Sequence, residues 1–468
     1  MSIVRAFNHP TAVVLATNSY SWASKLQEAE RGEASFVPAA LLNTSTLVNL
    51  DEFLVNHMVF TVKTNQLSVG MLESRWDAQI EKISGFFILA KYLDCPEDSK
   101  FWMNISSEDV CPRGSVDHTP TKTIVMMKPS SGMVEEIPKR IEEFILKNKV
   151  PTLPPKYRDA QNGLQGSSFR VGQRVELLDR FFPNQLHPAR IQKICGRRWH
   201  IKIIAEDSPI TEKNARQNGA QGEFWVDQGS IFLHPVGFAA FNEIKLVAND
   251  DYVEHSRAIA TSIRNGTPPA YHPDDVRFED LVNPVITTET WEQIEEGQKF
   301  ELLGPFAGTM LELKAASVLR KCESPGFIVV AADGEGEGTI EYLVHVSTPC
   351  LYPVGYAKAN KVLLKKARNG LRAEPGRTTS LPSSVFRPEP PRDRLALLKI
   401  GMYLEAADNN EPDQIWPARI RSIHGRLVRV GFEGWGKDAD QLYDIESHDL
   451  LPAGWCELHN YQLNMPPT

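Results

Sequence analysis

Cysteines, long apolar runs and leader features are all scarce in this sequence of 468 residues. Its six cysteines form no Cys-x-x-Cys pair, which argues against a disulfide scaffold and against a structural zinc module. No apolar run reaches the roughly 20 residues that a membrane-spanning helix needs. The apolar patch at 11–17 lacks the basic flank and the cleavage site of a signal peptide. These absences predict a soluble intracellular protein with reduced thiols and no membrane contact.

Positive charge is also in deficit. The chain has 51 Lys and Arg residues against 59 Asp and Glu residues, which gives a formal net charge of −8. Neutralised phosphates supply most of the non-specific affinity for nucleic acids, so a cationic partner suits this chain better than DNA or RNA. One basic run opposes the overall acidity, and we interpret it as a solvated face. It comprises Lys361, Lys365, Lys366, Arg368, Arg372 and Arg377.

The motifs of catalysis are missing as well. The sequence has no Gly-x-Ser-x-Gly elbow and no His-Glu-x-x-His motif, and its twelve histidines are scattered. Residues 431–438 resemble a phosphate-binding loop, but Asp438 stands where a Ser or Thr would bind Mg²⁺, and its charge would repel phosphate. The acidic glycine repeat at 333–338 is typical of a flexible turn. We therefore expect no enzyme activity, no catalytic residue, no cofactor and no metal site.

What the sequence does contain is one pattern that occurs four times. Each copy has one or two aromatic residues, a short polar stretch and then a Pro-x-Gly corner. The corner prolines are Pro112, Pro235, Pro353 and Pro452. The copies divide the chain into units one to four, which we place at 1–132, 133–248, 249–372 and 373–468.

Upstream of each corner, apolar and polar residues alternate over short stretches, as strands with one buried face require. The fourth unit has such stretches at 402–408 and 415–420, and the second repeats them at 174–179 and 186–191. Several short strands that close on themselves predict a small barrel in each unit.

The segments between the barrels differ from one another. Helical spacing of apolar residues at 22–29 and 137–145 predicts helices, and the Pro- and Ser-rich stretch 377–392 predicts an extended arm. Each barrel is too small to bury such an arm alone, so we expect the arms to pack on adjacent barrels. We also expect the corner aromatics Phe238 and Trp455 to be buried, each closing its own barrel.

Three elements of unit four resemble the malignant brain tumour (MBT) repeat family. They are Leu-Glu-Ala-Ala-Asp at 404–408, Phe-Glu-Gly-Trp at 432–435 and Pro-Ala-Gly-Trp at 452–455. The resemblance covers the whole chain and is strong in units two and four, weaker in three and weakest in one. It implies a mainly β fold of four tandem small β-barrels (Tudor-like MBT repeats), each preceded by an irregular or helical arm and packed into one compact array. It also implies a nuclear protein that acts on chromatin in transcriptional repression.

The same resemblance implies a methyl-lysine pocket in unit four. A methylated ammonium keeps its charge, so aromatic faces attract it by about 0.5–2 kcal/mol per good contact, and a carboxylate accepts its remaining N–H. Asp408, Phe432 and Trp435 match the family's cage positions, which favours mono- and dimethyl-lysine. The family's third aromatic position holds Ala439 here, and Tyr443 is the candidate substitute. The alternative is that Phe432 and Trp435 are barrel core and that Asp408 is a turn residue.

Units one to three lack the full set of cage residues and are predicted to be scaffold. Unit two keeps Asp179 without an aromatic pair, unit three has Gly304 in place of the Asp, and unit one has Tyr92 but Cys95 instead of the Trp. The leading hypothesis is a reader of methylated histone tails with other chromatin or repressor proteins as partners. The alternative is a structural scaffold with a degenerate cage. The basic run has a further alternative role, which is weak contact with nucleosomal DNA or with an importin.

Overall fold

The computed structural model describes residues 19–42, 48–64, 72–96, 99–114, 123–128, 132–133, 139–163, 167–204, 206–209, 222–281, 283–304, 311–333, 340–365 and 379–467. The predictions for 11–17, for the glycine repeat after Asp333 and for the basic run from 366 to 377 lie outside these residues. Within the described ranges, no helix is long and apolar enough to cross a membrane.

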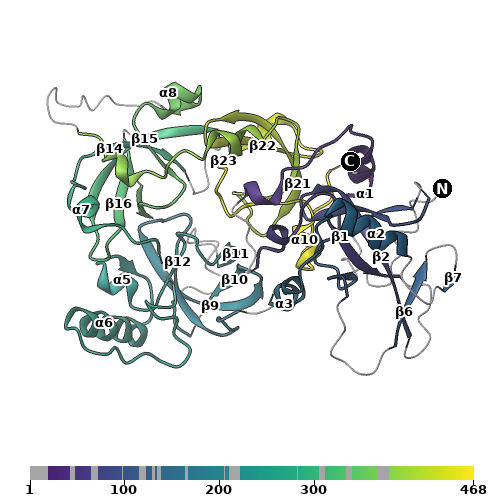
Figure 1. The fold of residues 1–468 in the computed structure, drawn as a ribbon. Coiled ribbons are helices and arrows are strands. Elements are labelled where there is room, and N and C mark those ends of the chain that lie inside the picture. Colours follow the sequence, from purple (N-terminus) through teal and green to yellow (C-terminus); the bar gives the residue numbers. More distant parts are fainter. Residues whose placement is uncertain are drawn as a thin grey trace.

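Four mainly antiparallel sheets form the framework of the protein (Figure 1). In each, the second, third and fourth strands follow one another as neighbours, and the first strand lies between the second and a short fifth strand. A later segment adds a parallel partner to the second strand, as a short strand in the first three sheets and as the bridge between Ile415 and Leu463 in the fourth. The prediction of a mainly β fold with four small barrels in one compact array is confirmed.

The strands and helices have the following bounds. The first sheet comprises β1 (Val59–Lys63), β2 (Leu72–Ser84), β3 (Phe87–Tyr92), β4 (Lys100–Asn104), β5 (Val110–Cys111), β6 (Thr123–Lys128) and β7 (Gly132–Met133). The second comprises β8 (Arg174–Leu178), β9 (Gln185–Cys195), β10 (Arg198–Ile203), β11 (Glu223–Asp227), β12 (Leu233–His234) and β13 (Lys245–Leu246). The third comprises β14 (Lys299–Leu303), β15 (Glu312–Lys321), β16 (Phe327–Ala332), β17 (Glu341–His345), β18 (Leu351–Tyr352) and β19 (Leu363–Lys365). The fourth comprises β20 (Tyr403–Ala407), β21 (Ile415–His424), β22 (Leu427–Phe432), β23 (Gln441–Asp444) and β24 (Leu450–Leu451). The helices are α1 (Ala23–Glu30), α2 (Lys139–Asn148), α3 (Lys156–Gly163), α5 (Phe238–Phe241), α6 (Asp250–Arg264), α7 (Thr288–Glu292), α8 (Tyr356–Asn360), α9 (Arg392–Ala396) and α10 (Trp455–Leu458), with 3-10 turns at Ala39–Leu41, Leu50–Phe53, Ser383–Val385 and Lys437–Ala439.

The four sheets follow the order of the four predicted units. The last strand of the first sheet, β7, ends one residue beyond the proposed limit at 132, and the proposed limit at 372 lies outside the described residues. Helical arms form where the apolar spacing predicts them: α2 buries Ile141 and Ile145 against Trp76 of the first barrel.

Strand β20 is buried on both of its faces. Successive side chains of a strand point to opposite faces, and here Leu404 and Ala406 enter the core of the fourth barrel while Tyr403 and Ala407 enter a second core. That second core contains Trp22 of the N-terminal arm and most of the first barrel's interior. The arm therefore covers a face that the fourth barrel cannot cover itself.

A buried glutamate in the first strand of units two, three and four fastens the Pro-x-Gly corner. In unit four, Glu405 accepts hydrogen bonds from the backbone N–H groups of Gly454 (2.7 Å) and Cys456 (2.8 Å). Gly454 lies in the left-handed region at φ 94°, a conformation that glycine adopts without steric cost. Glu176 and Glu301 bind their own corners in the same way. The recurring Glu and the recurring corner are thus two halves of one contact.

Among the described residues of unit one this contact is absent, and this unit also departs furthest from the sequence pattern. The position that corresponds to Glu405 in the strand register holds Thr61, which lies opposite Cys111 just as Glu405 lies opposite Leu451. The Thr61 hydroxyl instead donates to Asp77 at 2.8 Å.

The corner aromatics are buried as predicted, with Trp455 0% and Phe238 2% exposed. The expectation that each closes its own barrel is wrong, because the corner helices lie outside the barrels and point their rings at a neighbour. Trp455 lies in a core with Phe86 of unit one, and the ring of Phe238 lies 4.8 Å from that of Phe327 in unit three.

The Pro-x-Gly corners of units two, three and four each dock on the hairpin between the second and third strands of another unit. Corner two docks on unit three, corner three on unit four and corner four on unit one. The hydrogen bonds at these junctions are Ser324 N to Asn242 Oδ1 (2.7 Å), Arg426 N to Tyr356 Oη (2.8 Å) and Phe86 N to Ala453 O (2.8 Å). The interlocked arrangement expected of the arms therefore extends to the corners.

The first strand of each barrel pairs with one arm, and the N-terminal arm pairs with the last barrel. The segment after each of the first three barrels pairs with that barrel's first strand, through Thr152, Asp275 and Ser380. The fourth barrel takes its partner from the N-terminal arm, where Phe36 pairs with Tyr403. The two ends of the described chain consequently lie together (Figure 1), and Tyr20 N donates to Leu463 O at 2.8 Å.

Candidate functional site

Asp408 lies just after β20, at the open end of the fourth barrel. Its backbone N–H donates to Gln414 O at 2.9 Å, which continues the pairing between β20 and β21 by one step. Its side chain accepts two hydrogen bonds, from Asn410 N (2.8 Å) and from Gln441 Nε2 (2.7 Å), and both fall on Oδ1. Among the described residues Oδ2 takes no hydrogen bond, so one carboxylate oxygen remains to accept one from a ligand.

Gln441 contacts Asp408 directly, and Tyr443 in turn contacts Gln441. Gln441 is buried, and its Oε1 accepts from Asn409 N at 3.0 Å and lies 2.6 Å from the Tyr443 hydroxyl. The same hydroxyl lies 2.7 Å from Ala407 O. Burial raises the pKa of Tyr443 well above its usual value, so the phenol stays protonated and can donate. This chain of contacts fixes the direction in which the Asp408 carboxylate points.

The structure places Tyr443 inside the barrel, where it cannot replace the missing third aromatic as hypothesised. Its ring is only 2% exposed and belongs to the barrel core. The strand register gives the reason: Leu442, opposite Arg429, occupies the position that Trp225 occupies opposite His200 in unit two. Tyr443 is one residue further along and therefore points to the other face of the sheet.

The two predicted aromatic residues are placed differently. Phe432, the last residue of β22, is 3% exposed and packs in the barrel core, whereas Trp435 in the following turn is 44% exposed. The ring of Trp435 lies 5.4 Å from that of Trp416, with the two planes at 85°. Trp416 is partly buried and was not among the predicted site residues. Its signal in the sequence is the alternation within 415–420, which puts it on the same face as Ala418.

Unit two braces the loop that follows Asp408. Arg180 donates to the carbonyls of Asn409 and Asn410, and Arg198 donates to Pro412 O (2.9 Å) and to Asp449 Oδ1 (3.0 Å). Both arginines are buried, and burial lowers the pKa of Arg180. Side chains from unit two thus position the loop after Asp408 and the carboxylate of Asp449.

Comparisons with known proteins bear on this arrangement of repeats. The family model of the MBT repeat matches residues 173–253 and 402–468. Malignant brain tumor repeat protein 1 of Caenorhabditis elegans is 30% identical over 497 residues, which cover 96% of this chain and 86% of that protein. The chain belongs to the malignant brain tumour repeat family. Protein lin-61 of the same organism is 35% identical, over 96% of this chain and 76% of that protein.

A solved MBT structure has the same fold. The four MBT repeats of Drosophila melanogaster Sfmbt, in complex with the peptide RHR(me)KVLR, superpose with a TM-score of 0.74 at 24% identity, over 96% of this chain and 99% of that one. The Polycomb protein Sfmbt of that organism is 26% identical over 84% of this chain and 31% of its own length. The family model matches within MBT repeats two and four, the two that the motifs marked as strongest.

The second MBT repeat carries the corresponding acid in a closed form. Asp179 is buried and accepts from the Phe181 and Phe182 amides (2.8 and 3.1 Å), and His187 Nε2 lies 2.9 Å from its Oδ2. Burial alone would raise the pKa of Asp179, but these hydrogen bonds outweigh it and lower the pKa. Both oxygens are engaged by hydrogen bonds within the repeat, unlike those of Asp408.

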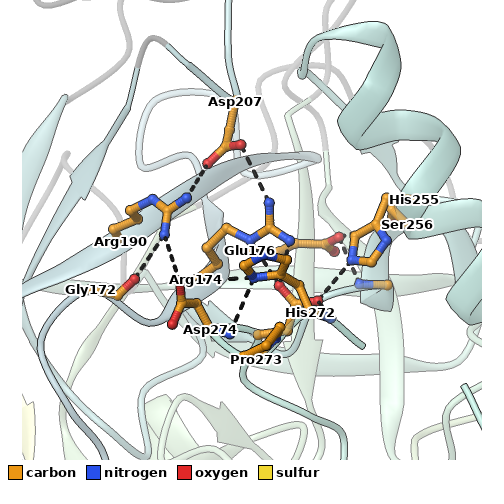
Figure 2. Close-up of polar contacts among 12 residues, drawn as sticks. Gly172, Arg174, Glu176, Arg190, Asp207, His255, Ser256, His272, Pro273 and Asp274 are labelled. Carbon is orange, nitrogen blue, oxygen red and sulfur yellow. Dashed lines mark hydrogen bonds and ion pairs between the residues drawn. The ribbon is translucent and has the colours of Figure 1, made fainter. Parts of the chain in front are cut away.

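A polar cluster at the rim of the same MBT repeat is structural (Figure 2). It joins Arg174 to Asp275 (2.7 Å) and to Asp207 (3.5 Å), and His255 of α6 to Asp275 (2.8 Å). Beneath it, burial raises the pKa of Glu176 to about 7. Its charged groups pair with one another and fasten α6 to the barrel. No group of three or more His, Cys, Asp or Glu side chains in the described part of the chain could hold a metal ion.

Proposed function

We propose that this protein is a chromatin reader that binds methylated lysine on histone tails through its fourth MBT repeat. The observation that carries the proposal is the Asp408 carboxylate, which has one oxygen uncommitted at the end of the barrel where Trp435 is exposed. The Sfmbt repeats, which share this fold, were solved with a peptide that contains methylated lysine. Phe432, in the barrel core three residues before Trp435, would form the floor of the pocket.

The chemistry of the pocket favours the lower methyl states. Mono- and dimethyl-lysine keep an N–H that Asp408 Oδ2 can accept as a charge-assisted hydrogen bond, whereas trimethyl-lysine has none. The indole face of Trp435 supplies cation–π attraction to any of the three. The net charge of −8 complements a basic histone tail. The Polycomb name of Sfmbt supports a nuclear role in transcriptional repression alongside other chromatin proteins, with nucleosomal DNA a weak contact at most.

Replacing Asp408 or Trp435 with alanine should abolish binding of methyl-lysine peptides. Loss of a hydrogen bond to a charged group costs about 1.5–3 kcal/mol, which is roughly tenfold to more than a hundredfold in affinity. Isothermal calorimetry with un-, mono-, di- and trimethylated peptides measures the effect. The control is Asp438→Ala, which removes an equal charge from an exposed position in the neighbouring turn. Unchanged affinity in both cage variants would refute this pocket.

A scaffold for chromatin proteins with a degenerate cage is the second candidate, and the burial of Phe432 favours it. The same titration separates the two functions. A wild-type chain that binds no methylated peptide, yet still associates with chromatin proteins, would be a scaffold.

A further inference from the structure

The proposed cage has no aromatic residue at the third of its expected positions. The position of the family's third aromatic holds Ala439, and Tyr443 is inside the barrel. Phe432 is almost fully covered, so Trp435 alone would present an open aromatic face. A methylammonium held by one ring and one carboxylate remains exposed to water, which weakens cation–π attraction.

Trp416 stands where a further wall is needed. Ala418 and Ile420 of β21 point into the fourth barrel, and alternation continues this face to Trp416, nearer the open end. Leu404 and Ala406 of β20 point inward in the same way, and alternation continues that face to Asp408. The acid and the indole therefore lie on one face of two paired strands. The ring planes of Trp416 and Trp435 are nearly perpendicular, at 85°, so the two rings can border a ligand on adjacent sides.

The second repeat shows how far a side chain at this position reaches. His187 lies opposite Leu177 just as Trp416 lies opposite Ala406, so the two occupy the same place in the register. His187 Nε2 reaches the carboxylate of its own repeat's acid, Asp179, at 2.9 Å. A side chain at the Trp416 position is therefore adjacent to the acid.

The first repeat shows what an indole does there. Its residue at this position is Trp76, opposite Val62. Trp76 packs with Tyr92 and Cys95, which stand at the positions of Phe432 and Trp435. In that repeat Ile141 of α2 covers the group and Trp76 is fully buried. In the fourth repeat Trp416 is only partly buried and Trp435 is exposed.

We infer that Trp416 is the third aromatic wall of the methyl-lysine pocket and takes the place of the residue missing at Ala439. The inference rests on the proposed function. In the second repeat a histidine pairs with the acid and closes the site; in the fourth, the indole leaves the Asp408 carboxylate open and adds an aromatic face beside it. Between repeats two and four, which both keep the acid, this position therefore separates an engaged carboxylate from one with a free oxygen.

Three substitutions at Trp416 test the inference by calorimetry on the full chain with the mono- and dimethyl-lysine peptides. Trp416→Ala should weaken binding about tenfold, since removal of one desolvated cation–π wall costs about as much as one decade in affinity. Trp416→Phe should retain most of the affinity, because it keeps a smaller aromatic face. Trp416→His should lose binding as completely as Asp408→Ala, because the imidazole would engage the carboxylate as His187 engages Asp179. Thermal melts check that each variant is folded.

Three outcomes would overturn the inference. If Trp416→Ala binds like the wild type while Asp408→Ala does not, the third wall is wrong and the reader function stands. If the wild type binds no methylated peptide, both fail together. Should Trp416→Ala unfold, the comparison of the Phe and His variants decides, and equal affinities for the two would refute the inference.

Discussion

Replacing Trp455 with alanine is expected to lower the free energy of unfolding by about 3–5 kcal/mol, the range measured when a buried Trp or Phe is truncated in a core. Trp455 is fully buried, and its removal would open a cavity between the corner of unit four and the interior of unit one. Equilibrium denaturation and a thermal melt measure the loss.

The matched control for this prediction is Trp435→Ala, because Trp435 is 44% exposed and its removal leaves no cavity. Phe238→Ala should behave like Trp455→Ala, since it breaks the corresponding junction between units two and three. A melt of the Trp455 variant that matches the wild type would show that the corner does not hold the units together.

A fragment that contains only 377–468 should be poorly soluble or partly unfolded, although it contains every residue of the proposed cage. It would lose the pairing of Phe36 with Tyr403 and the hydrogen bond from Trp22 Nε1 to Glu405 (2.9 Å). It would also lose Arg180 and Arg198, which hold the loop after Asp408. Circular dichroism, gel filtration and peptide calorimetry measure the outcome.

A circular permutant provides the control for the excised fragment. Joining residue 468 to residue 1 and opening the chain at 377 keeps the N-terminal arm and unit two in the same molecule as unit four, and Tyr20 and Leu463 are already hydrogen-bonded. The permutant should fold and bind like the parent. An isolated fragment that is well folded and binds as tightly as the full chain would refute the interlocked architecture while leaving the reader function intact.

The barrels could be predicted from the sequence because alternation and the Pro-x-Gly corners are local signals. The partners of the arms could not. Nothing in the local pattern of 19–42 indicates that Phe36 pairs with a strand more than 350 residues away. The burial of both faces of β20 is the one trace of this pairing, since Tyr403–Ala407 is apolar on both sides except for Glu405.

Prediction of the candidate site was limited by register. Asp408 and Trp435 could be proposed from the sequence because they lie in motifs of fixed spacing. The face that Tyr443 takes could not be predicted, since the turn between β22 and β23 has no fixed length and one step exchanges the faces of a strand. Trp416 was not proposed from the sequence because it comes from the neighbouring strand and so lies outside the segment in which the family's aromatics occur.

The pairing of Phe36 with Tyr403 also limits how this protein can evolve. An open solenoid can gain or lose a copy at either end, because each copy contacts only its sequence neighbours. Here the first arm completes the last barrel, so a fifth copy, or the loss of one, would separate the two halves of that contact. Adding or losing a copy therefore carries a cost in this chain that an open solenoid does not have. Divergence is left to substitutions within the copies, such as the change from His187 in repeat two to Trp416 in repeat four.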